Sequence, residues 1–455
     1  MPDLSQLPSI DHLLRQPEVL EIIQTFGRPL TLTALRTMLE DLRQAALQKD
    51  QAIPPEAEII DLIRAQLEDW TAPTLVPVIN ASGVILHTNL GRAPLSRATR
   101  EAISEIGTGY SNLEFNLASG KRGKRSVHAS RILSLLTGAE DGFVVNNNAG
   151  AVLLTLSALA SGRKVLVSRT QLVEIGGGFR IPDVMRQSGA TLVEIGTTNR
   201  VHLRDFEQSL ASGDITLVLI AHHSNFKLIG FHSEPALADI VETAHQHGVP
   251  VVHDIGSGAL LDTAEFGLAH EPTVQESLAA GCDLVCFSGD KLVGGPQAGI
   301  IIGKRDLLAP IKTHPFARAL RAGKLTLTGV SANLLHYLSN EALSKVPVWQ
   351  MISMPLETLQ ARAEHWKEAL GFGEVLPGKS TVGGGSLPTE EMPTTTLTLT
   401  PDKPDSFLRA LREVAPPIIA RIENDQVLFD PRTVLIEQEE LFLQHLKQVW
   451  NASGH

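Results

Sequence analysis

The chain has 455 residues, more than one hydrophobic core usually supports, so we expect two or three domains. Its composition, 43% hydrophobic and 20% charged, is that of an ordinary globular protein, and no apolar run approaches the roughly 18 residues that a membrane-spanning helix needs. The net charge of −11 excludes a general attraction for nucleic acid, so any RNA contact would need a local basic patch. Because no basic residue precedes Arg15 and no apolar block follows, we expect no secretory signal and a cytoplasmic protein.

The first 75 residues have a helical pattern throughout. Apolar residues recur at three- and four-residue steps, and prolines at positions 54, 55 and 73 separate the segments. We therefore predict a small separate helical domain over residues 1–75. Six Lys or Arg against twelve Asp or Glu make this segment acidic, so its composition alone does not indicate RNA binding.

From residue 76 to about 330 the pattern changes to short β-branched runs that alternate with amphipathic stretches. Continuous apolar strands separated by helices indicate a mostly parallel sheet covered on both faces, so this part is predicted to be an α/β core. The predicted strands are residues 142–145, 164–167, 191–195, 215–220, 249–253 and 283–287.

Residues 331–455 are predicted to form a smaller α+β domain, with strands at 394–399 and 427–429 and helices at 404–413 and 437–450. The glycine-rich residues 382–386 read as a loop.

The chain has two cysteines, Cys282 and Cys286. Their spacing places both on one strand with their side chains on the same face, and it cannot form a disulfide framework. A redox or metal pair has no supporting His or Cys nearby, so we expect ordinary buried core residues.

Polar or glycine-rich segments follow three of the predicted strands. Asp254 follows the strand at 249–253, Lys291 comes shortly after the strand at 283–287, and Asn147 and Asn148 follow the strand at 142–145. Ligands of open α/β sheets bind at the carboxyl ends of strands, so these segments together could bind one cofactor. A strand-end carboxylate can keep a pyridine nitrogen protonated, and a neighbouring lysine can form an imine, which is the chemistry of pyridoxal phosphate (PLP).

A phosphate site is predicted beside these groups. The small residues Ala149 and Gly150 would let a helix amino terminus approach the PLP phosphate, and Ser288 is a further hydroxyl donor. Taken singly, a strand-end Asp before glycine is usually a turn and a lysine after a strand is usually solvated.

The order of these residues along the chain resembles fold-type I PLP enzymes. Residues 146–150 come first, then Asp254, then Lys291, followed by glycine-rich residues 294–299 and an apolar run at 300–302. This resemblance implies an α/β fold with a mostly parallel central sheet and PLP held as a Schiff base on Lys291.

Longer segments narrow the resemblance to one family. Residues 79–95, 110–114, 144–149 and 288–291 resemble those of bacterial selenocysteine synthases, and the similarity extends from about residue 76 to the carboxyl terminus. The helical segment before it also has the placement of the domain that binds tRNA in that family. Shorter relatives that act on small amino acids or amino sugars lack this segment.

The resemblance implies a conversion of seryl-tRNA(Sec) to selenocysteyl-tRNA(Sec) with selenophosphate as donor, and a homo-oligomer, in this family a decamer. Lys291 would remove the Cα proton, hydroxide would leave Cβ, and selenium would add to the resulting aminoacrylyl-tRNA. Asp290 would assist the leaving hydroxyl. A PLP lyase for a free amino acid or amino sugar, or a non-catalytic RNA-binding relative, are the alternatives, although the presence of Asp254 and Lys291 argues against the latter.

Site residues follow from the same resemblance. Guanidinium groups suit bidentate binding of selenophosphate. As alternatives, the loop at 121–125, which contains Arg125, could be solvated or touch tRNA. Arg318 and Arg321, three apart on a predicted helix, could pair with carboxylates. His222 and His223 are adjacent without a matching third ligand, so we expect no metal. The expected residues are Lys291, Asp290 and Asp254 for catalysis; Lys291, Asp254, Asn147, Asn148, Ala149, Gly150, Ser288 and, at the ring hydroxyl, Asn225 for PLP; and Arg92, Arg125, Arg318 and Arg321 for selenophosphate.

Overall fold

The computed structural model describes residues 4–49, 51–175 and 178–454. The chain divides into two compact units, Met1–Pro77 and Val78–His455. Across the described residues, no helix has the length and apolar character that crossing a membrane requires.

The first unit is helical, as its apolar periodicity predicts. Ser9 caps the first helix by accepting from the His12 backbone N–H, and Pro17 occupies the first position of the second helix, where its missing N–H costs nothing. The apolar stripes meet in a core of their own that includes Val19, Leu35 and Ile63. Its elements are a 3-10 turn Leu4–Gln6 and the helices α1 (Ile10–Leu13), α2 (Pro17–Phe26), α3 (Arg28–Lys49) and α4 (Glu56–Thr71).

The second unit contains a seven-stranded sheet whose strands are parallel except for one. The exception, β13, runs antiparallel to both of its neighbours, β12 and β5. The strand order is β5-β13-β12-β11-β10-β6-β9. The bounds are β5 (Asp141–Val145), β6 (Lys164–Ser168), β9 (Thr191–Ile195), β10 (Ile215–Ala221), β11 (Val251–Gly256), β12 (Leu284–Ser288) and β13 (Gly299–Gly303).

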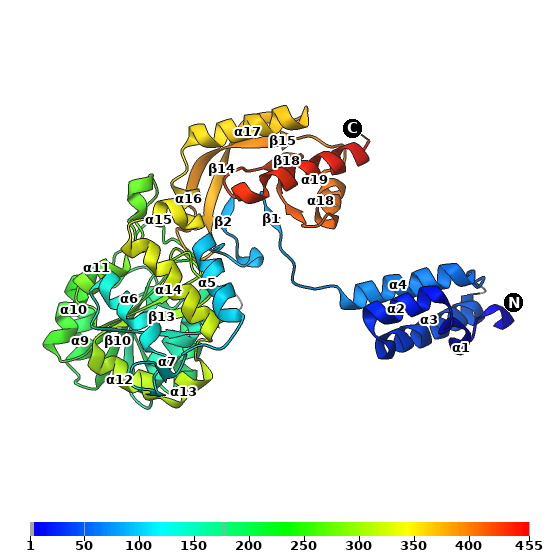
Figure 1. The fold of residues 1–455 in the computed structure, drawn as a ribbon. Helices are drawn as coiled ribbons and strands as arrows, with labels where there is room; N and C mark the ends of the chain where they lie inside the picture. Colours follow the sequence, from blue (N-terminus) through cyan, green and yellow to red (C-terminus); the bar gives the residue numbers. More distant parts are fainter. Residues whose placement is uncertain (1–3, 50, 176–177, 455) are drawn as a thin grey trace. The chain divides into compact units, whose positions relative to one another are not determined.

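Both faces of this sheet are buried, which is why its strands are apolar without alternation. Successive side chains point to opposite faces, so Val144 joins one hydrophobic cluster while Phe143 and Val145 join another. Helices cover each cluster, and Figure 1 shows them around the sheet. The first cluster includes residues of α6 (Val127–Thr137), α9 (Leu203–Leu210), α10 (Leu237–Gln246) and α14 (Lys324–Leu338), and the second includes residues of α7 (Asn148–Ala160), α8 (Ile181–Ser188) and α12 (Arg305–Thr313).

A second sheet of five strands follows in the same unit. Its order is β17-β18-β15-β14-β2, and Trp366, Phe407 and Phe442 from three helices pack on it. The strands are β2 (Val84–Leu86), β14 (Glu374–Gly383), β15 (Glu391–Leu399), β17 (Arg421–Glu423) and β18 (Gln426–Phe429), and the helices are α17 (Leu356–Leu370), α18 (Pro404–Glu413) and α19 (Glu439–Ala452).

The remaining elements are mostly short. They are the strand pairs β1 (Ile79–Asn80) with β16 (Ile418–Ile419), β3 (Phe115–Asn116) with β4 (Lys121–Arg122), and β7 (Glu174–Ile175) with β8 (Phe179–Arg180); the helices α5 (Arg97–Gly107), α11 (Val274–Ala279), α13 (Pro315–Ala319), α15 (Ala342–Lys345) and α16 (Pro347–Ile352); and the 3-10 turns Thr88–Leu90, Arg169–Gln171, Thr263–Phe266 and Ile436–Gln438.

The structure differs from the expected pattern in three places. The strand expected at 249–253 runs to Gly256, so Asp254 lies within β11 rather than after it. The expected change of domain near residue 330 falls inside α14, and β2, from before the core, belongs to the second sheet through its pairing with β14. Sequence periodicity reports a strand's burial but not its partner, so this pairing left no signal.

Both cysteines are free and buried, as expected. The prediction that they share one face is wrong, because Cys282 precedes β12 and packs in one cluster while Cys286, inside the strand, packs in the other. Burial raises the pKa of the Cys282 thiol to about 12, so this thiol stays protonated at neutral pH.

Candidate active site

Three neighbouring parallel strands bring their carboxyl ends together at one edge of the large sheet. Strand β11 lies between β10 and β12, with Asp254 paired in register to Ala221 on one side and Cys286 on the other. Lys291 follows three residues after β12 ends at Ser288. The sheet topology therefore places Asp254 and Lys291 at the same edge.

Asp254 is a buried carboxylate with one hydrogen-bond donor supplied by a helix. The Asn148 side-chain Nδ2 donates to Asp254 Oδ1 at 2.8 Å, from the first residue of α7. Burial raises the pKa of Asp254, and the Asn148 hydrogen bond opposes that rise. A buried carboxylate calls for a cationic partner, which a protonated pyridine nitrogen would supply.

Lys291 is buried beside it, with 4% of its surface exposed. Its Nζ donates to the Gly385 carbonyl oxygen at 3.3 Å. Burial lowers the pKa of Lys291, Arg92 adds to this effect, and Asp254, Asp290 and Glu271 oppose it. A lowered pKa increases the neutral amine fraction, which is the form that attacks a carbonyl to make an imine.

Glycine is required where the chain closes over this lysine. Gly385 has a φ of +84°, and a Cβ there would lie 2.5 Å from Lys291 Nζ. The glycine-rich segment that the sequence marked as a loop therefore forms a wall of the site, and its glycines are the signal that could have indicated this.

The amino terminus of α7 lies where the sequence predicts a phosphate site. Asn147 caps the helix by accepting from the Gly150 backbone N–H at 2.7 Å, which leaves the first-turn N–H groups of Asn148 and Ala149 without acceptors inside the helix. A 13-residue helix directs its positive end toward this point. The buried Ser288 pairs with Gly299, where a Cβ would lie 2.9 Å from the Asn148 backbone nitrogen.

These residues fit PLP. The buried Asp254 suits the ring nitrogen, the buried amine of Lys291 suits the imine, and the start of α7 suits the phosphate. The Asn148 Oδ1 atom is also buried with no hydrogen-bond partner among the described residues, so the site has capacity for a polar ligand.

Asp290 is engaged by an arginine. Arg92 Nη1 donates to Asp290 Oδ2 at 2.7 Å, and this ion pair is largely shielded, with 29% and 9% of the two side chains exposed. Because Asp290 directly precedes Lys291, this ion pair places Arg92 at the Lys291 site.

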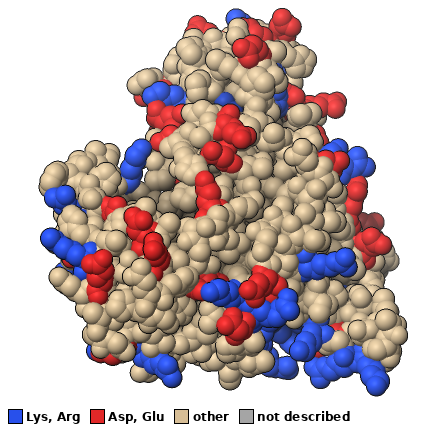
Figure 2. All heavy atoms as spheres, turned by 90° about the vertical axis from the view of Figure 1, so that its left-hand side faces the viewer, with Lys and Arg blue, Asp and Glu red and all other residues tan. Residues whose placement is uncertain are grey.

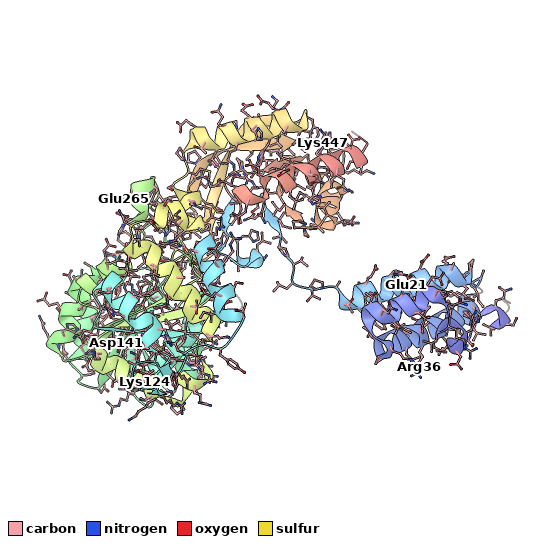
Figure 3. The ribbon with its side chains drawn as sticks, viewed as in Figure 1. Glu21, Arg36, Lys124, Asp141, Glu265 and Lys447 are labelled. Atoms are coloured by element: carbon pink, nitrogen blue, oxygen red, sulfur yellow. The ribbon has the colours of Figure 1, made fainter. Side chains whose placement is uncertain are left out.

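The other three arginines lie together elsewhere. Arg125, Arg318 and Arg321 line a cavity of about 880 Å³, and Lys291 and Asp254 are not among its described lining residues. Lys124 and Asp141, labelled in Figure 3, also line it. The four predicted arginines therefore form two groups within one chain.

Hydrogen bonds hold Arg125 in the arginine cavity and join the neighbouring segment to the end of β5. Arg125 donates to Glu114 Oε1 through Nε and Nη2, at 3.0 and 2.8 Å, and to the Ala322 carbonyl through Nη1. The adjoining chain pairs with the strand end, since the Asn146 N–H donates to the Leu320 carbonyl. Arg318 and Arg321 themselves are exposed. On the face that Figure 2 shows, basic and acidic side chains are interspersed, so this face does not carry charge of one sign.

Asn225 is exposed, and its Nδ2 donates to the Glu174 carbonyl at 2.8 Å. Its neighbour Ser224 is buried and lies nearer the lysine, because a Cβ on Gly256 would be 3.2 Å from Ser224 Oγ and 3.7 Å from Lys291 Nζ. The contact of Asn225 with the ring hydroxyl stays a prediction that this arrangement does not favour.

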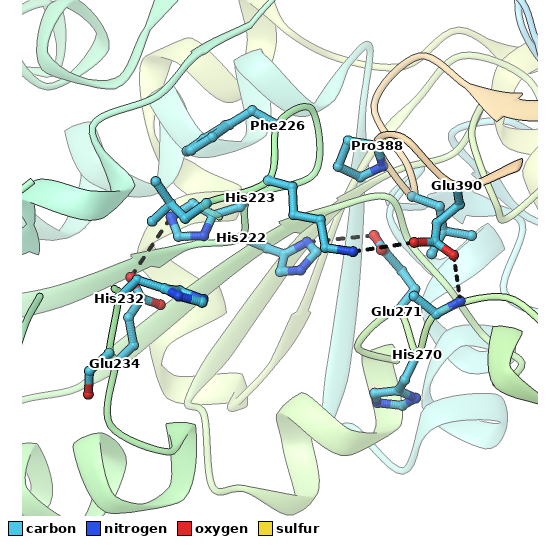
Figure 4. Close-up of a pocket in the computed structure, with 14 residues that line it drawn as sticks. His222, His223, Phe226, His232, Glu234, His270, Glu271, Pro388 and Glu390 are labelled. Carbon is cyan, nitrogen blue, oxygen red and sulfur yellow. Dashed lines mark hydrogen bonds and ion pairs between the residues drawn. The ribbon is translucent and has the colours of Figure 1, made fainter. Parts of the chain in front are cut away.

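Two further residues at this edge were not expected as parts of the site. His222, considered only as a metal ligand, and Glu271 line one cavity (Figure 4), and the charge of Lys291 acts on both side chains. Within the described part of the chain, no group of three or more His, Cys, Asp or Glu residues could hold a metal ion. Glu271 lies in the loop before α11, where the sequence offers no periodicity from which to find it.

The sheet order, the antiparallel β13 and the lysine after β12 define the fold-type I class of PLP-dependent enzymes. The structure of D-glucosaminate-6-phosphate ammonia-lyase shares this fold, with a TM-score of 0.58 at 18% identity, over 84% of this chain and 97% of that one. The predicted fold class is confirmed.

Sequence comparison identifies the family. Residues 78–435 match the family L-seryl-tRNA selenium transferase, and residues 4–43 match the family Selenocysteine synthase N terminal. The L-seryl-tRNA(Sec) selenium transferase of Carboxydothermus hydrogenoformans is 42% identical over 96% of this chain and 95% of its own length, and that of Geobacter sulfurreducens is 43% identical over 98% and 99%. The chain belongs to the L-seryl-tRNA selenium transferase family, which confirms the resemblance.

Proposed function

We propose that this protein is a PLP-dependent enzyme that converts seryl-tRNA(Sec) to selenocysteyl-tRNA(Sec), with selenophosphate as the selenium donor. The observation that carries the proposal is the buried pair at the sheet edge, Lys291 beside Asp254, in a chain whose relatives bear the name of this activity over nearly their full length.

The residues at the carboxyl ends of the sheet strands have distinct chemical roles. When bound, PLP withdraws electrons from Cα of the attached amino acid and makes its proton acidic. Asp254, held by Asn148, keeps a proton on the ring nitrogen, and the first turn of α7 holds the phosphate. Lys291 has a pKa lowered by burial, so its free amine can accept the Cα proton.

Selenium delivery is assigned to the arginines. Arg318 and Arg321 line a cavity with Arg125, and their guanidinium groups suit a phosphate compound through paired hydrogen bonds. Arg92 instead pairs with Asp290, so we assign it to the Lys291 site. Its positive charge there adds to the charge around the substrate.

We assign tRNA binding to the helical unit Met1–Pro77. It has its own core and matches the amino-terminal family description, which supports a separate role despite its acidic balance. A homo-oligomer, in the family a decamer, and a cytoplasmic location are kept as further predictions, the first to be checked by light scattering of the purified protein.

Reconstitution tests the function. The purified protein loaded with PLP should convert seryl-tRNA(Sec) and selenophosphate to selenocysteyl-tRNA(Sec), with no turnover of free serine. Borohydride reduction followed by peptide mapping should place the cofactor on Lys291. Turnover of free serine in place of seryl-tRNA would favour a lyase of small amino acids.

A further inference from the structure

A cavity of about 490 Å³ opens between the end of β10 and the loop that precedes α11 (Figure 4). Its described lining includes His222, Glu271 and Leu387. Lys291 is close enough that its charge affects the pKa values of both His222 and Glu271. The cavity therefore adjoins the amine that takes the Cα proton, on the side occupied by a histidine and a carboxyl group.

Two polar atoms in this cavity face each other without partners. His222 Nδ1 and Glu271 Oε1 are 3.6 Å apart, beyond hydrogen-bond distance, and neither has a hydrogen-bond partner among the described residues. The Glu271 side chain is 3% exposed. A buried carboxyl oxygen without a partner is costly, so a ligand group that both donates and accepts, such as a hydroxyl, would satisfy the pair.

Burial controls the protonation of both side chains. It raises the pKa of the Glu271 carboxyl, which therefore keeps its proton to a higher pH than an ordinary glutamic acid. It lowers the pKa of His222 to about 4, with His223 and Lys291 adding to the effect, so the imidazole is neutral near pH 7. Burial therefore favours the protonated form of the Glu271 carboxyl and the neutral form of the His222 imidazole.

The other carboxyl group near the lysine is poorly suited to give up a proton. Asp290 Oδ2 already accepts a hydrogen bond from Arg92 Nη1 at 2.7 Å, so this carboxyl group is engaged by a guanidinium rather than open to a leaving hydroxyl. A group that protonates a leaving hydroxyl must carry the proton beforehand.

We propose that Glu271, which lies across this cavity from His222, is the acid that protonates the seryl hydroxyl as it leaves Cβ. The Cβ–O bond breaks and its electron pair goes to oxygen, the carboxyl proton of Glu271 completes a water molecule, and the Cα proton is retained on Lys291. The Glu271 carboxylate then regains a proton from solvent through the cavity. This inference rests on the proposed function, and it assigns to Glu271 the step that the sequence suggested for Asp290.

Single-turnover dehydration of seryl-tRNA by the full-length, PLP-loaded protein tests the inference, with pyruvate measured after deacylation. Glu271→Gln should slow dehydration about 10²-fold or more, the range of a lost general acid. Glu271→Asp retains an acid and should recover part of the rate. His222→Gln should have a smaller effect because the carboxyl group of Glu271 is still present in this variant.

A substrate whose leaving group needs no proton separates catalysis from structure. β-Chloroalanyl-tRNA loses chloride, so Glu271→Gln should process it at the wild-type rate. Glu390→Gln is the matched control, because Glu390 lines the same cavity and pairs with Lys227 at 3.4 Å. This control should leave the ratio of the two rates unchanged.

A measurement without turnover gives an independent check. Infrared difference spectra between wild type and Glu271→Gln near neutral pH should show the C=O stretch of one protonated carboxyl group, present only in the wild type. Normal dehydration by Glu271→Gln, equal slowing of both substrates, or a spectrum without that band would each overturn the inference. If the wild type itself does not dehydrate seryl-tRNA, the proposed function fails, whereas an active wild type with unaffected variants contradicts only the role of Glu271.

Discussion

Two regions of the second unit differ in how their charged groups are held. One is the proposed cofactor edge, the carboxyl ends of the strands that carry Asp254 and Lys291, and the other is the cavity lined by Arg125, Arg318 and Arg321. At the edge, Asp254 and Lys291 are buried, and each makes a hydrogen bond to a fixed neighbour. In the cavity, Arg125 is tied to Glu114 and to a backbone carbonyl, but Arg318 and Arg321 are exposed. The edge positions its groups before any ligand arrives, and the cavity leaves two cations accessible to a mobile anion.

This difference predicts different sensitivities. A buried ionisable group that loses its partner or its charge disturbs everything around it, so changes at the edge should be severe. An exposed arginine is solvated and its replacement by lysine retains the charge, so changes in the cavity should be graded.

The largest effect is expected from Lys291→Ala, which removes the amine that we propose binds PLP and takes the Cα proton. The visible absorbance of the imine and all turnover should disappear. Lys367→Ala, at an exposed lysine in the last turn of α17, is the control and should keep both. An imine band that survives in the Lys291 variant would place the cofactor on another lysine.

Asp254→Asn should retain part of the bound cofactor while turnover falls about 10²- to 10³-fold, the scale of one lost electrostatic contact at a reacting centre. A neutral amide accepts no proton and cannot hold the ring nitrogen charged. Absorbance titration with PLP and a single-turnover assay measure the two quantities separately. Wild-type turnover in this variant would remove Asp254 from the site.

Deletion of residues 1–77 should leave a folded protein that binds PLP, because the two compact units have separate hydrophobic cores. Affinity for seryl-tRNA should fall about 10²-fold, as expected when one of two linked binding modules is lost. Filter binding of labelled tRNA is the measurement. Equal affinity would assign the RNA to the second unit, with the basic residues 121–125 as the first candidates.

The smallest effect is expected from Arg318→Lys, which keeps the charge but loses the planar fork. Affinity for selenophosphate should fall about 10-fold, the loss of one charge-assisted hydrogen bond, while dehydration of seryl-tRNA stays normal. Selenium addition should therefore recover at high donor concentration. Slow dehydration with an unchanged donor dependence would instead indicate a structural role.

The sequence predicts most of the large sheet and its cofactor edge because the relevant signals are local. Apolar runs mark the strands, and Asp254 and Lys291 follow or end them, so parallel topology alone brings the two together. The hydrogen bond from Asn148 to Asp254 joins residues 106 apart and has no local pattern, so the sequence alone places Asn148 only among the cofactor-binding residues.

Features that depend on loop conformation were not predictable in this way. Glu271 and Gly385 come near Lys291 from loops, and Asn225, four residues after β10 ends, donates to the Glu174 carbonyl instead. The pairing of Arg92 with Asp290 likewise joins residues 198 apart. Spacing along the chain cannot reveal which side chains a loop brings back to a strand end.

The second sheet joins residues that are far apart in the chain. Strand β2 pairs with β14, and the Gly83 N–H donates to Thr433 Oγ1 across 350 residues. These contacts affect folding during translation. On a ribosome, β2 emerges early and β14 and Thr433 emerge near the end of translation. Until then the growing chain carries an unpaired strand edge, which is a site for association with other chains. The second sheet can close only when synthesis is almost complete, so slow elongation late in the message would prolong the aggregation-prone interval, whereas the large sheet can form beforehand.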